Sequence, residues 1–364
     1  MKKGFLLLVI GILCSNFMGC AGDGAKDQSE AVEMPLSQTA VVQTAPSETE
    51  TSSEESSEVS QETEEFVPIP IDEEHFPDEI FRERVRGTYD FVENDNVISL
   101  QELEMFDQIK LDAEKNPEDA ECKSLEGIQY LITLGTLRIN GLENLHEMDL
   151  SANTKLTELD VNNCGVEKLD LSACSELSFL QLLGNEKLET LKLDNPMLAD
   201  LRITYCAMNE LDFSKCPALS YVYLCNMNFT DLDFRGDQEL EDLHVMRCMS
   251  LERIDLSGNS KLKLLDLFYC PIKTLDLSNN VALEYVSVDG TDLTELDLRD
   301  HQQLVCVTCE NTPITKIDIR GCDLLTDLVK NNAGVENNSD MTWRSTENED
   351  MQVIVPIVCQ VISE

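Results

Sequence analysis

Aromatic and basic residues are both scarce in this chain of 364 residues. Only 5 % of the residues are aromatic, and 27 Lys and Arg face 70 Asp and Glu, which gives a formal net charge of −43. Binding to nucleic-acid phosphates relies on Lys and Arg that release counterions, and anionic membranes attract polybasic segments. The charge therefore argues against nucleic acid as a ligand and against a membrane held by charge alone. It favours a soluble, self-repelling protein that faces outwards.

Long hydrophobic runs are also missing. The apolar run 5–13 follows Lys2 and Lys3; it is too short to cross a bilayer but has the length of a signal-peptide core. The stretch "FMGCAG" that follows resembles a bacterial lipobox, with Cys20 as the lipidated residue. We therefore expect 1–20 to be a lipoprotein signal peptide, and the mature protein to be exported, anchored to the cell membrane through its lipid and exposed at the cell surface. Cleavage without lipidation, which gives a secreted product, is the alternative.

The segment 21–65 has no aromatic residue and is dense in Ser, Thr, Gln and Glu. Such a segment cannot bury enough apolar surface to offset the entropy of ordering, and its acidic charges repel one another. We expect a disordered acidic linker that lifts the remaining chain from a membrane.

Two helices are expected next. The first carries Phe76, Ile80, Phe81 and Val85 on one stripe, with Pro77 in its first turn. The second, at 101–109, has the apolar residues Leu103, Phe106 and Ile109 facing inward.

A repeat begins near Leu125. The stretch "LTELDVNNCGVEKLDLSACSEL" at 156–177 states one phrase twice, and its central apolar residue recurs in steps of ten or eleven from Leu137 to Leu328. Two steps make a coil of about 21 residues, and a fixed period in that range predicts a solenoid. Apolar residues at every second position followed by a polar turn predict strands rather than helices. One coil cannot bury its own apolar face, so stacked coils must share a continuous core.

The repeats resemble the leucine-rich repeat family, whose phrase is L-x-x-L-x-L-x-x-N/C-x-L. The stretch 71–79, "IDEEHFPDE", further resembles the start of the helical cap in a subfamily of bacterial surface proteins with short repeats of L-x-x-L-D-L-S type. The resemblance implies a solenoid of parallel β-strands with about nine coils. It implies a small helical N-terminal cap at 66–124 with an EF-hand-like loop, repeats at 125–328 and a short C-terminal β cap at 329–364. We expect "DMQVIVPIVCQVI" to be a final strand that seals the last coil, with Trp343 packed under it.

The two halves of each coil differ. One half, which we name the constant half, carries Asp before its inward apolar residue in nearly every copy: Asp149, Asp170, Asp212, Asp233, Asp255, Asp276, Asp297 and Asp318. The other, the variable half, has Asp160, Gln181, Arg202, Tyr223, His244, Asp266, Ser287 and Thr308 at the same place. The aspartates could suggest a metal ladder, but Lys and Arg on the same half offset their charge, so a solvated, partly paired edge is the favoured interpretation.

Outward aromatic residues occur only on the variable half, although both halves share the same core. Aromatic rings give large contact area at low rotamer cost, and leucine-rich repeats usually bind ligands through a variable strand face. We predict a ligand-binding face made of Phe179, Arg202, Tyr205, Tyr221, Tyr223, His244, Phe268, Tyr269 and Tyr285. Tyr205 is expected to lie close to Tyr221 and Tyr223, and Tyr269 close to Tyr285. Rings that merely cover neighbouring apolar surface are the alternative.

The sequence thus favours a non-enzymatic recognition or adhesion protein that binds a protein on another cell or in the envelope. Glycan binding through exposed tyrosines and a structural spacer without a specific ligand are alternatives. The four His are scattered, and no catalytic motif is present. A thiol–imidazole pair between Cys225 and His244 is the one catalytic arrangement that the repeat register allows.

Calcium and disulfides are the remaining questions. In "FVENDNVISLQE" the weak calcium candidates are Glu93, Asp95 and Glu102, but Phe91 stands at the first ligand position. No other cofactor is expected. One recurring repeat position holds Cys164, Cys174, Cys206, Cys216, Cys248, Cys270 and Cys322. We expect buried free thiols in a reducing or oxygen-poor setting, while Cys248 and Cys270, one coil apart, could approach within bridging range.

Overall fold

A computed structural model describes residues 66–330, 335–337, 341–344, 352–355 and 360–362, with side chains for 66–326. The expected signal peptide, Cys20 and the acidic linker lie outside the described residues. The chain divides into two units, Met1–Glu65 and Phe66–Glu364, and the second holds all described elements. Among these, no helix has the length and apolar character needed to cross a membrane.

The N-terminal part of this unit is a small helical layer. Its elements are β1 (Ile69–Pro70), α2 (Glu79–Tyr89), β2 (Val97–Ile98), α3 (Leu100–Met105), and the 3₁₀ turns η1 (Pro117–Glu121) and η2 (Ile128–Tyr130). Asp78 caps α2 by accepting the Phe81 N–H at 3.0 Å. Pro77 therefore precedes the cap instead of standing in the first turn, and Tyr89, not Ile80, joins Phe81 and Val85 as a buried residue of the helix.

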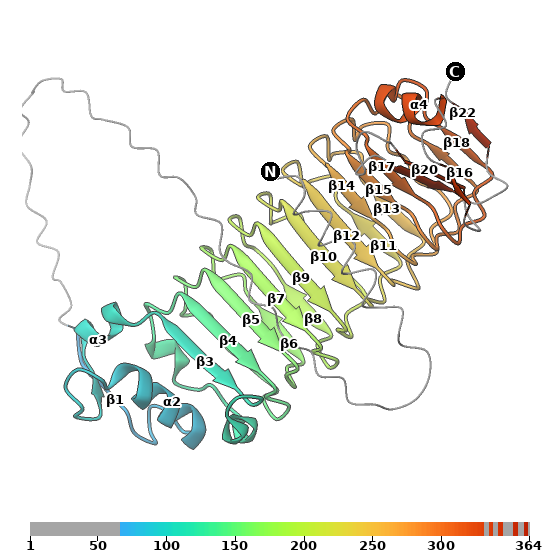
Figure 1. The fold of residues 1–364 in the computed structure, drawn as a ribbon. Helices are drawn as coiled ribbons and strands as arrows, with labels where there is room; N and C mark the ends of the chain where they lie inside the picture. The colour runs from blue at the N-terminus through green and yellow to red at the C-terminus, as the bar shows by residue number, and fades with distance from the viewer. Residues whose placement is uncertain (1–65, 331–334, 338–340, 345–351, 356–359, 363–364) are drawn as a thin grey trace, which may run out of the picture. The chain divides into compact units, whose positions relative to one another are not determined.

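Eleven parallel strands of the variable half and two antiparallel strands at one edge form one sheet of 13 strands (Figure 1). The parallel strands are β4 (Thr136–Asn140), β5 (Glu158–Asn162), β7 (Phe179–Leu183), β9 (Asp200–Thr204), β10 (Tyr221–Cys225), β12 (Asp242–Met246), β14 (Leu264–Asp266), β15 (Tyr285–Ser287) and β17 (Cys306–Thr308), with β3 (Gln108–Asp112) before and β21 (Gln352–Val355) after them. Neighbours from β4 to β17 pair with residues 21 or 22 positions further along, as Leu159 with Leu180 and Leu243 with Leu265 show. This spacing confirms a solenoid whose coil has the length expected from the repeat.

The constant half forms shorter strands in separate sheets. They are β6 (Lys168–Asp170) with β8 (Thr190–Lys192), β11 (Asp231–Asp233) with β13 (Arg253–Asp255), and β16 (Glu295–Asp297) with β18 (Lys316–Asp318) and β22 (Gln360–Ile362). The inward residues of both halves share one core, in which Leu159, Leu180, Leu201, Leu171 and Leu298 are fully buried. Each such leucine contributes about 2 kcal/mol through its removal from water.

Both ends of the repeat differ from the expectation. Ile109 lies on β3, which pairs in parallel with β4, and α3 ends at Met105; the helix predicted at 101–109 is therefore wrong over its last residues. Leu328, expected as the last repeat position, lies in α4 (Asp323–Lys330). The segment 352–362 supplies both β21 and β22, a further coil, and the antiparallel strands β19 (Val335–Asn337) and β20 (Met341–Arg344) close the edge of the main sheet. Trp343 lies on β20, and its side chain is outside the described ones.

A column of buried turn residues runs along the constant half, and seven of its nine members donate a side-chain hydrogen bond to a carbonyl of the preceding coil. The column consists of Asn153, Cys174, Asn195, Cys216, Asp237, Asn259, Asn280, His301 and Cys322, and the two that do not donate are Cys216 and Asp237. Asn259 Nδ2 donates to the carbonyls of Phe234 (2.9 Å) and Asp237 (2.7 Å), and Asn280 does the same one coil later. His301 Nε2 and Cys322 Sγ donate to single carbonyls. The repeat phrase accepts N or C here because both supply a buried donor to backbone that would otherwise lack one.

Asp237 is the one acidic member of this column. It takes the same turn as the others, with its backbone N–H donating to Phe234 O, and is 2 % exposed. A carboxylate has no donor to offer a carbonyl, whereas a protonated carboxyl has one. Burial, assisted by the charges of Asp233 and Asp212, raises the pKa of Asp237 to about 7. Between about pH 4 and pH 7, Asp237 of the folded protein therefore keeps a proton that the same side chain loses in the unfolded chain.

We predict that Asp237→Asn stabilises the protein at alkaline pH. Between about pH 4 and pH 7 the native state holds more protons at this site than the unfolded state, so its contribution to stability falls as pH rises. An amide removes that dependence and restores the donor, which should raise the free energy of unfolding by about 1–3 kcal/mol at pH 8. Urea unfolding across this pH range measures the effect. Asn259→Asp is the matched control and should create the same deficiency one coil later; equal stabilities of wild type and Asp237→Asn at pH 8 would contradict the assignment.

Candidate ligand-binding face

The outward side chains of the main sheet form the variable face. On β5 and β9 half-buried residues alternate with buried ones, so that Leu201 and Ile203 point into the core while Arg202 points away from it. Strand pairing places Arg202 beside Tyr223, Tyr223 beside His244, and His244 beside Asp266. The variable positions of the sequence thus lie next to one another in space, as a row across neighbouring coils.

An arginine–aromatic cluster occupies the middle of this row. The Arg202 guanidinium lies 5.0 Å from the ring centre of Tyr221 and 5.4 Å from that of Phe179. Asp200 holds the same guanidinium with two hydrogen bonds of 2.8 Å. The His244 ring lies 5.6 Å from Tyr221 and 5.9 Å from Tyr223, measured between centroids. These predicted site residues are therefore brought together as one cluster with fixed side chains.

Cys225 and His244 do not form a catalytic pair. His244 faces Asp266, with 3.7 Å between Nδ1 and Oδ2, whereas Cys225 aligns with Met246 in the strand register. The Tyr223 hydroxyl and the Asn226 amide both donate to the Cys225 thiol. Burial raises the pKa of Cys225 to about 11, so the thiol keeps its proton at neutral pH and is a poor nucleophile.

Tyr205 and Tyr269 lie at the rim of the face, and the contacts expected for them are wrong. Both follow their strands instead of belonging to them: Tyr205 N donates to Cys225 O, and Tyr269 N to Asp289 O. In the register Tyr285 aligns with Leu264, so Tyr269 lies several residues further along the coil from Tyr285. The Tyr269 ring instead contacts Phe268, at 4.6 Å between centroids, and lies against Gly290. Tyr205 is likewise separated from Tyr221 and Tyr223. Two side chains on neighbouring coils align only when their residue numbers differ by about one full coil.

The rim position has a left-handed backbone in every coil from β4 to β17. The residues that occupy it are Gly141, Asn163, Gly184, Tyr205, Asn226, Arg247, Tyr269, Gly290 and Asn311, all with positive φ. Gly and Asn adopt this conformation readily, whereas a bulky side chain there costs about 1–2 kcal/mol. Tyr205 (φ 51°), Arg247 (φ 53°) and Tyr269 (φ 54°) are the exceptions. The sequence already shows Gly or Asn at this position in all but three coils. The same comparison identifies Arg247 as a further candidate, which the search for aromatic residues did not include.

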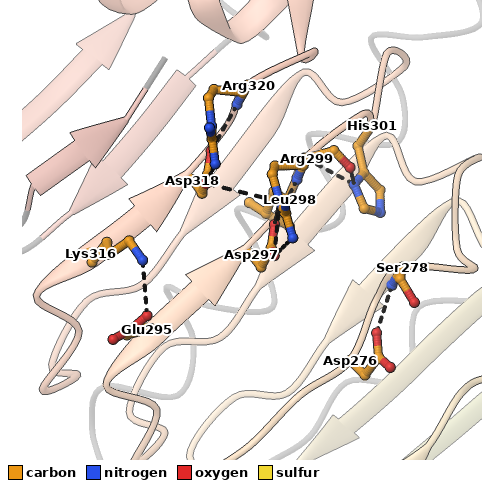
Figure 2. A network of polar contacts seen from close by, with 10 residues as sticks. All are labelled: Asp276, Ser278, Glu295, Asp297, Leu298, Arg299, His301, Lys316, Asp318 and Arg320. Atoms are coloured by element: carbon orange, nitrogen blue, oxygen red, sulfur yellow. Dashed lines mark hydrogen bonds and ion pairs between the residues drawn. The ribbon is translucent and has the colours of Figure 1, made fainter. Parts of the chain in front are cut away.

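Aspartates of the constant half serve the backbone. Asp149, Asp170, Asp212, Asp255 and Asp276 each accept the N–H of the serine two residues later, at 2.8–3.0 Å. Hydrogen bonds from Ser172 and then Lys192 hold the pKa of Asp170 at about 2. In the last coils arginine replaces serine, and Asp297–Arg299 and Asp318–Arg320 form ion pairs along the edge (Figure 2). The repetition on this half is therefore explained by turn formation, and no group of residues suited to a metal ion occurs among the described ones.

A hollow of about 950 Å³ also lies on the constant half, lined by Leu125, Met148, Lys168 and Asp170 among others. Its aspartates are those already engaged in turns, and Lys168 and Asp170 stand at positions that recur from coil to coil. Because the aspartates of this hollow are already engaged in turns, the variable face is the better candidate.

The EF-hand-like loop satisfies its own carboxylates. Glu102 accepts the N–H of Val92 (3.1 Å) and of Ser99 (2.9 Å), in a capping box with Ser99 at the start of α3. Although burial acts to raise it, the hydrogen bonds from Ser99 and Val92 hold the pKa of Glu102 below its ordinary value. Asp90 accepts the N–H of Asp95 and Asn96. Calcium at Glu93, Asp95 and Glu102 would have to displace these donors.

The fold is a leucine-rich repeat solenoid. No family model matches the chain, and no curated protein matches it. Among solved structures it is similar to three internalins of Listeria monocytogenes. The functional domain of InlJ, described as including a cysteine ladder, is 17 % identical over 76 % of this chain and 85 % of that one, with a TM-score of 0.27. InlF is 18 % identical over 71 % and 96 % (TM-score 0.32), and InlC2 18 % over 59 % and 95 % (TM-score 0.41). These likenesses are too distant to carry an argument about function.

We predict that Tyr205→Asn stabilises the fold. Asn occupies the same left-handed position in three other coils, so the change should raise the free energy of unfolding by about 1 kcal/mol. Urea unfolding with an unchanged m-value measures it. Tyr223→Asn, on a strand, is the control and should lower stability. A loss of stability in Tyr205→Asn would mean that this ring serves the fold.

We predict that calcium leaves the melting temperature unchanged at about 1 mM, the range in which extracellular calcium modules bind. Glu102→Gln should lower the melting temperature equally with and without calcium, because it weakens the capping box. Calorimetry of the full chain measures both. A rise in melting temperature with calcium that Asp95→Ala abolishes would contradict this prediction.

Proposed function

We propose that this chain is a non-enzymatic recognition protein that binds a partner protein through its variable face. The main support for this proposal is that Tyr205, Arg247 and Tyr269 occupy left-handed backbone positions, which Gly or Asn occupies in the other coils. Backbone strain of this kind persists where a side chain serves something other than the fold. All three positions border the face that holds the arginine–aromatic cluster.

The cluster has the properties of a binding hot spot. Tyr and Arg are the residues that most often dominate the energy of protein interfaces. Arg202 is held by Asp200 and by the rings of Phe179 and Tyr221, so little side-chain entropy remains to be lost on binding. On the constant half the described Asp–Arg pairs Asp233–Arg235, Asp297–Arg299 and Asp318–Arg320 lie along the edge without aromatic rings beside them.

A protein partner fits this surface better than a glycan. The Arg202 guanidinium covers one face of both Phe179 and Tyr221, which reduces the flat ring area open to a sugar. A spacer without a ligand would have no use for strained tyrosines at its rim. The net charge of −43 argues against nucleic acid, and that exclusion rests on charge alone.

Export and anchoring belong to the same proposal. The segment 1–20 with Cys20 supports a lipidated N-terminus, and the acidic segment 21–65 supports a linker that presents the repeats at the cell surface. A recognition face is useful only where a partner can reach it, and a membrane-anchored lipoprotein satisfies that requirement.

The face variant Arg202→Ser/Tyr221→Ser/Tyr223→Ser should lose its partner while it keeps its fold. Proximity labelling from the full-length protein on living cells identifies which proteins lie next to it. The proteins labelled by the wild type should be depleted at least about tenfold with the face variant, since hot-spot residues each contribute 2 kcal/mol or more.

Arg253→Ser/Glu239→Ser/Lys261→Ser, on exposed positions outside the variable face, is the matched control and should label the wild-type set. Circular dichroism confirms that both variants are folded. If the folded face variant labels the same proteins as the control, the variable face is not the binding surface and the proposal fails.

A further inference from the structure

Asp266 is a buried carboxylate that lacks a hydrogen-bond partner. It is the outward residue at the end of β14, yet it is 9 % exposed. Its Oδ1 atom is fully buried and accepts no hydrogen bond from any residue that the structure describes. Its Oδ2 atom lies 3.7 Å from His244 Nδ1, which is longer than a hydrogen bond. Leaving a charged group buried without a partner costs several kcal/mol, so the free protein carries a deficiency at this point.

The surroundings of Asp266 are aromatic and acidic. His244 aligns with it on one side and the small Ser287 on the other, while Phe268 follows two residues later in the turn after β14. Beyond Ser287 lies Asp289, whose carboxylate accepts a hydrogen bond of 2.9 Å from Thr308 Oγ1. Burial, together with the charges of Glu310 and Asp266, raises the pKa of Asp289 to about 7. A second carboxylate thus lies near Asp266 and adds to the acidic character of this part of the face.

We infer that Asp266 is the anchor for a positively charged side chain, Lys or Arg, of the partner protein. This inference rests on the proposed function and names the chemistry that the variable face selects. A partner cation supplies the hydrogen bond that His244, at 3.7 Å from Oδ2, does not give, and charge-assisted bonds to a desolvated carboxylate are the strong ones. The Phe268 ring, two residues further along the chain, favours a cation over a neutral donor.

Arg202 and Asp266 together give the face polarity. The Arg202 guanidinium, paired with Asp200, lies among rings, and three coils of the register further on Asp266 presents a negative charge. A partner that places an acidic or aromatic group over Arg202 and a basic one over Asp266 is bound in one direction only. Opposite charges at fixed separation select both the partner and its orientation.

The first test needs no partner. Asp266→Asn should raise the melting temperature of the free full-length protein, because an amide removes a buried charge that His244, at 3.7 Å, does not reach with a hydrogen bond. Asp292→Asn, an exposed aspartate with the same change in net charge, is the control and should leave it unchanged. A fall in the melting temperature of Asp266→Asn would show that the carboxylate supports the fold and would overturn the inference.

The second test is a double-mutant cycle with peptides. Random dodecapeptides are selected on the wild-type protein, and each binder's basic residues are replaced singly by norleucine. Binding is measured to wild type and Asp266→Asn. One basic residue should lose at least about tenfold in affinity on the wild type and almost nothing on Asp266→Asn, a coupling of about 1.4 kcal/mol.

The net charge attracts any cationic peptide, so the control must match it. Asp292→Asn should retain the full tenfold loss at the same basic residue. If peptides bind in a manner that depends on Arg202 and Tyr221 but show no coupling to Asp266, the proposed function stands and this inference fails. If selection gives no peptide whose binding depends on the variable face, both fail.

Discussion

The constraint on which this structure depends is the supply of hydrogen-bond donors from one coil to the carbonyls of the preceding coil. Most coils of this solenoid satisfy the buried carbonyls of their turns in this way. Asn195, Asn259 and Asn280 each reach two carbonyls of the preceding coil, and His301 and Cys322 reach one. This column sets the coil length, because a donor one residue out of step would miss both acceptors. The regular stacking of strands, and with it the alignment of outward side chains, follows from that length.

The two halves divide the requirements of stability and recognition between them. On the constant half aspartates accept backbone N–H groups and pair with arginines, while the buried oxygens left without a partner are the neutral amide Oδ1 atoms of Asn153, Asn259 and Asn280. The variable face departs from this in two ways: bulky residues stand at left-handed positions, and the buried oxygen without a partner belongs to an acidic residue, Asp266. Natural proteins accept local instability of this kind at functional sites, where a stable scaffold over-determines the geometry. The uniform half supplies that scaffold.

The period of the repeat was enough to predict the solenoid, its parallel strands and the inward column of Leu159, Leu180 and Leu201. The repeat period failed at the two ends, where the repeat motif is less regular. Ile109 lies on a strand although its sequence predicts a helix, and Leu328 lies on a helix although its sequence predicts a repeat strand. Composition placed the aromatic residues on one half, but it could not separate strand from rim, so Tyr205 and Tyr269 were given the wrong neighbours. The sequence did not distinguish Asp266 from the other variable residues, because a missing hydrogen-bond partner can be recognised only in the three-dimensional structure.

The cysteines of the core carry a consequence for the life of the chain. All eleven described ones are buried and free, so the folded protein shields its sulfur atoms from oxidants by packing alone. Burial raises the pKa of Cys174 and Cys216 to about 11, which also suppresses thiol–disulfide exchange. A nascent chain has neither protection, and its thiols, spaced a coil apart, could join in wrong pairs that lock the layers out of step. The chain must therefore fold and bury its thiols before they are oxidised. The presence of cysteine rather than asparagine at these positions suits surroundings in which thiol oxidation is slower than folding.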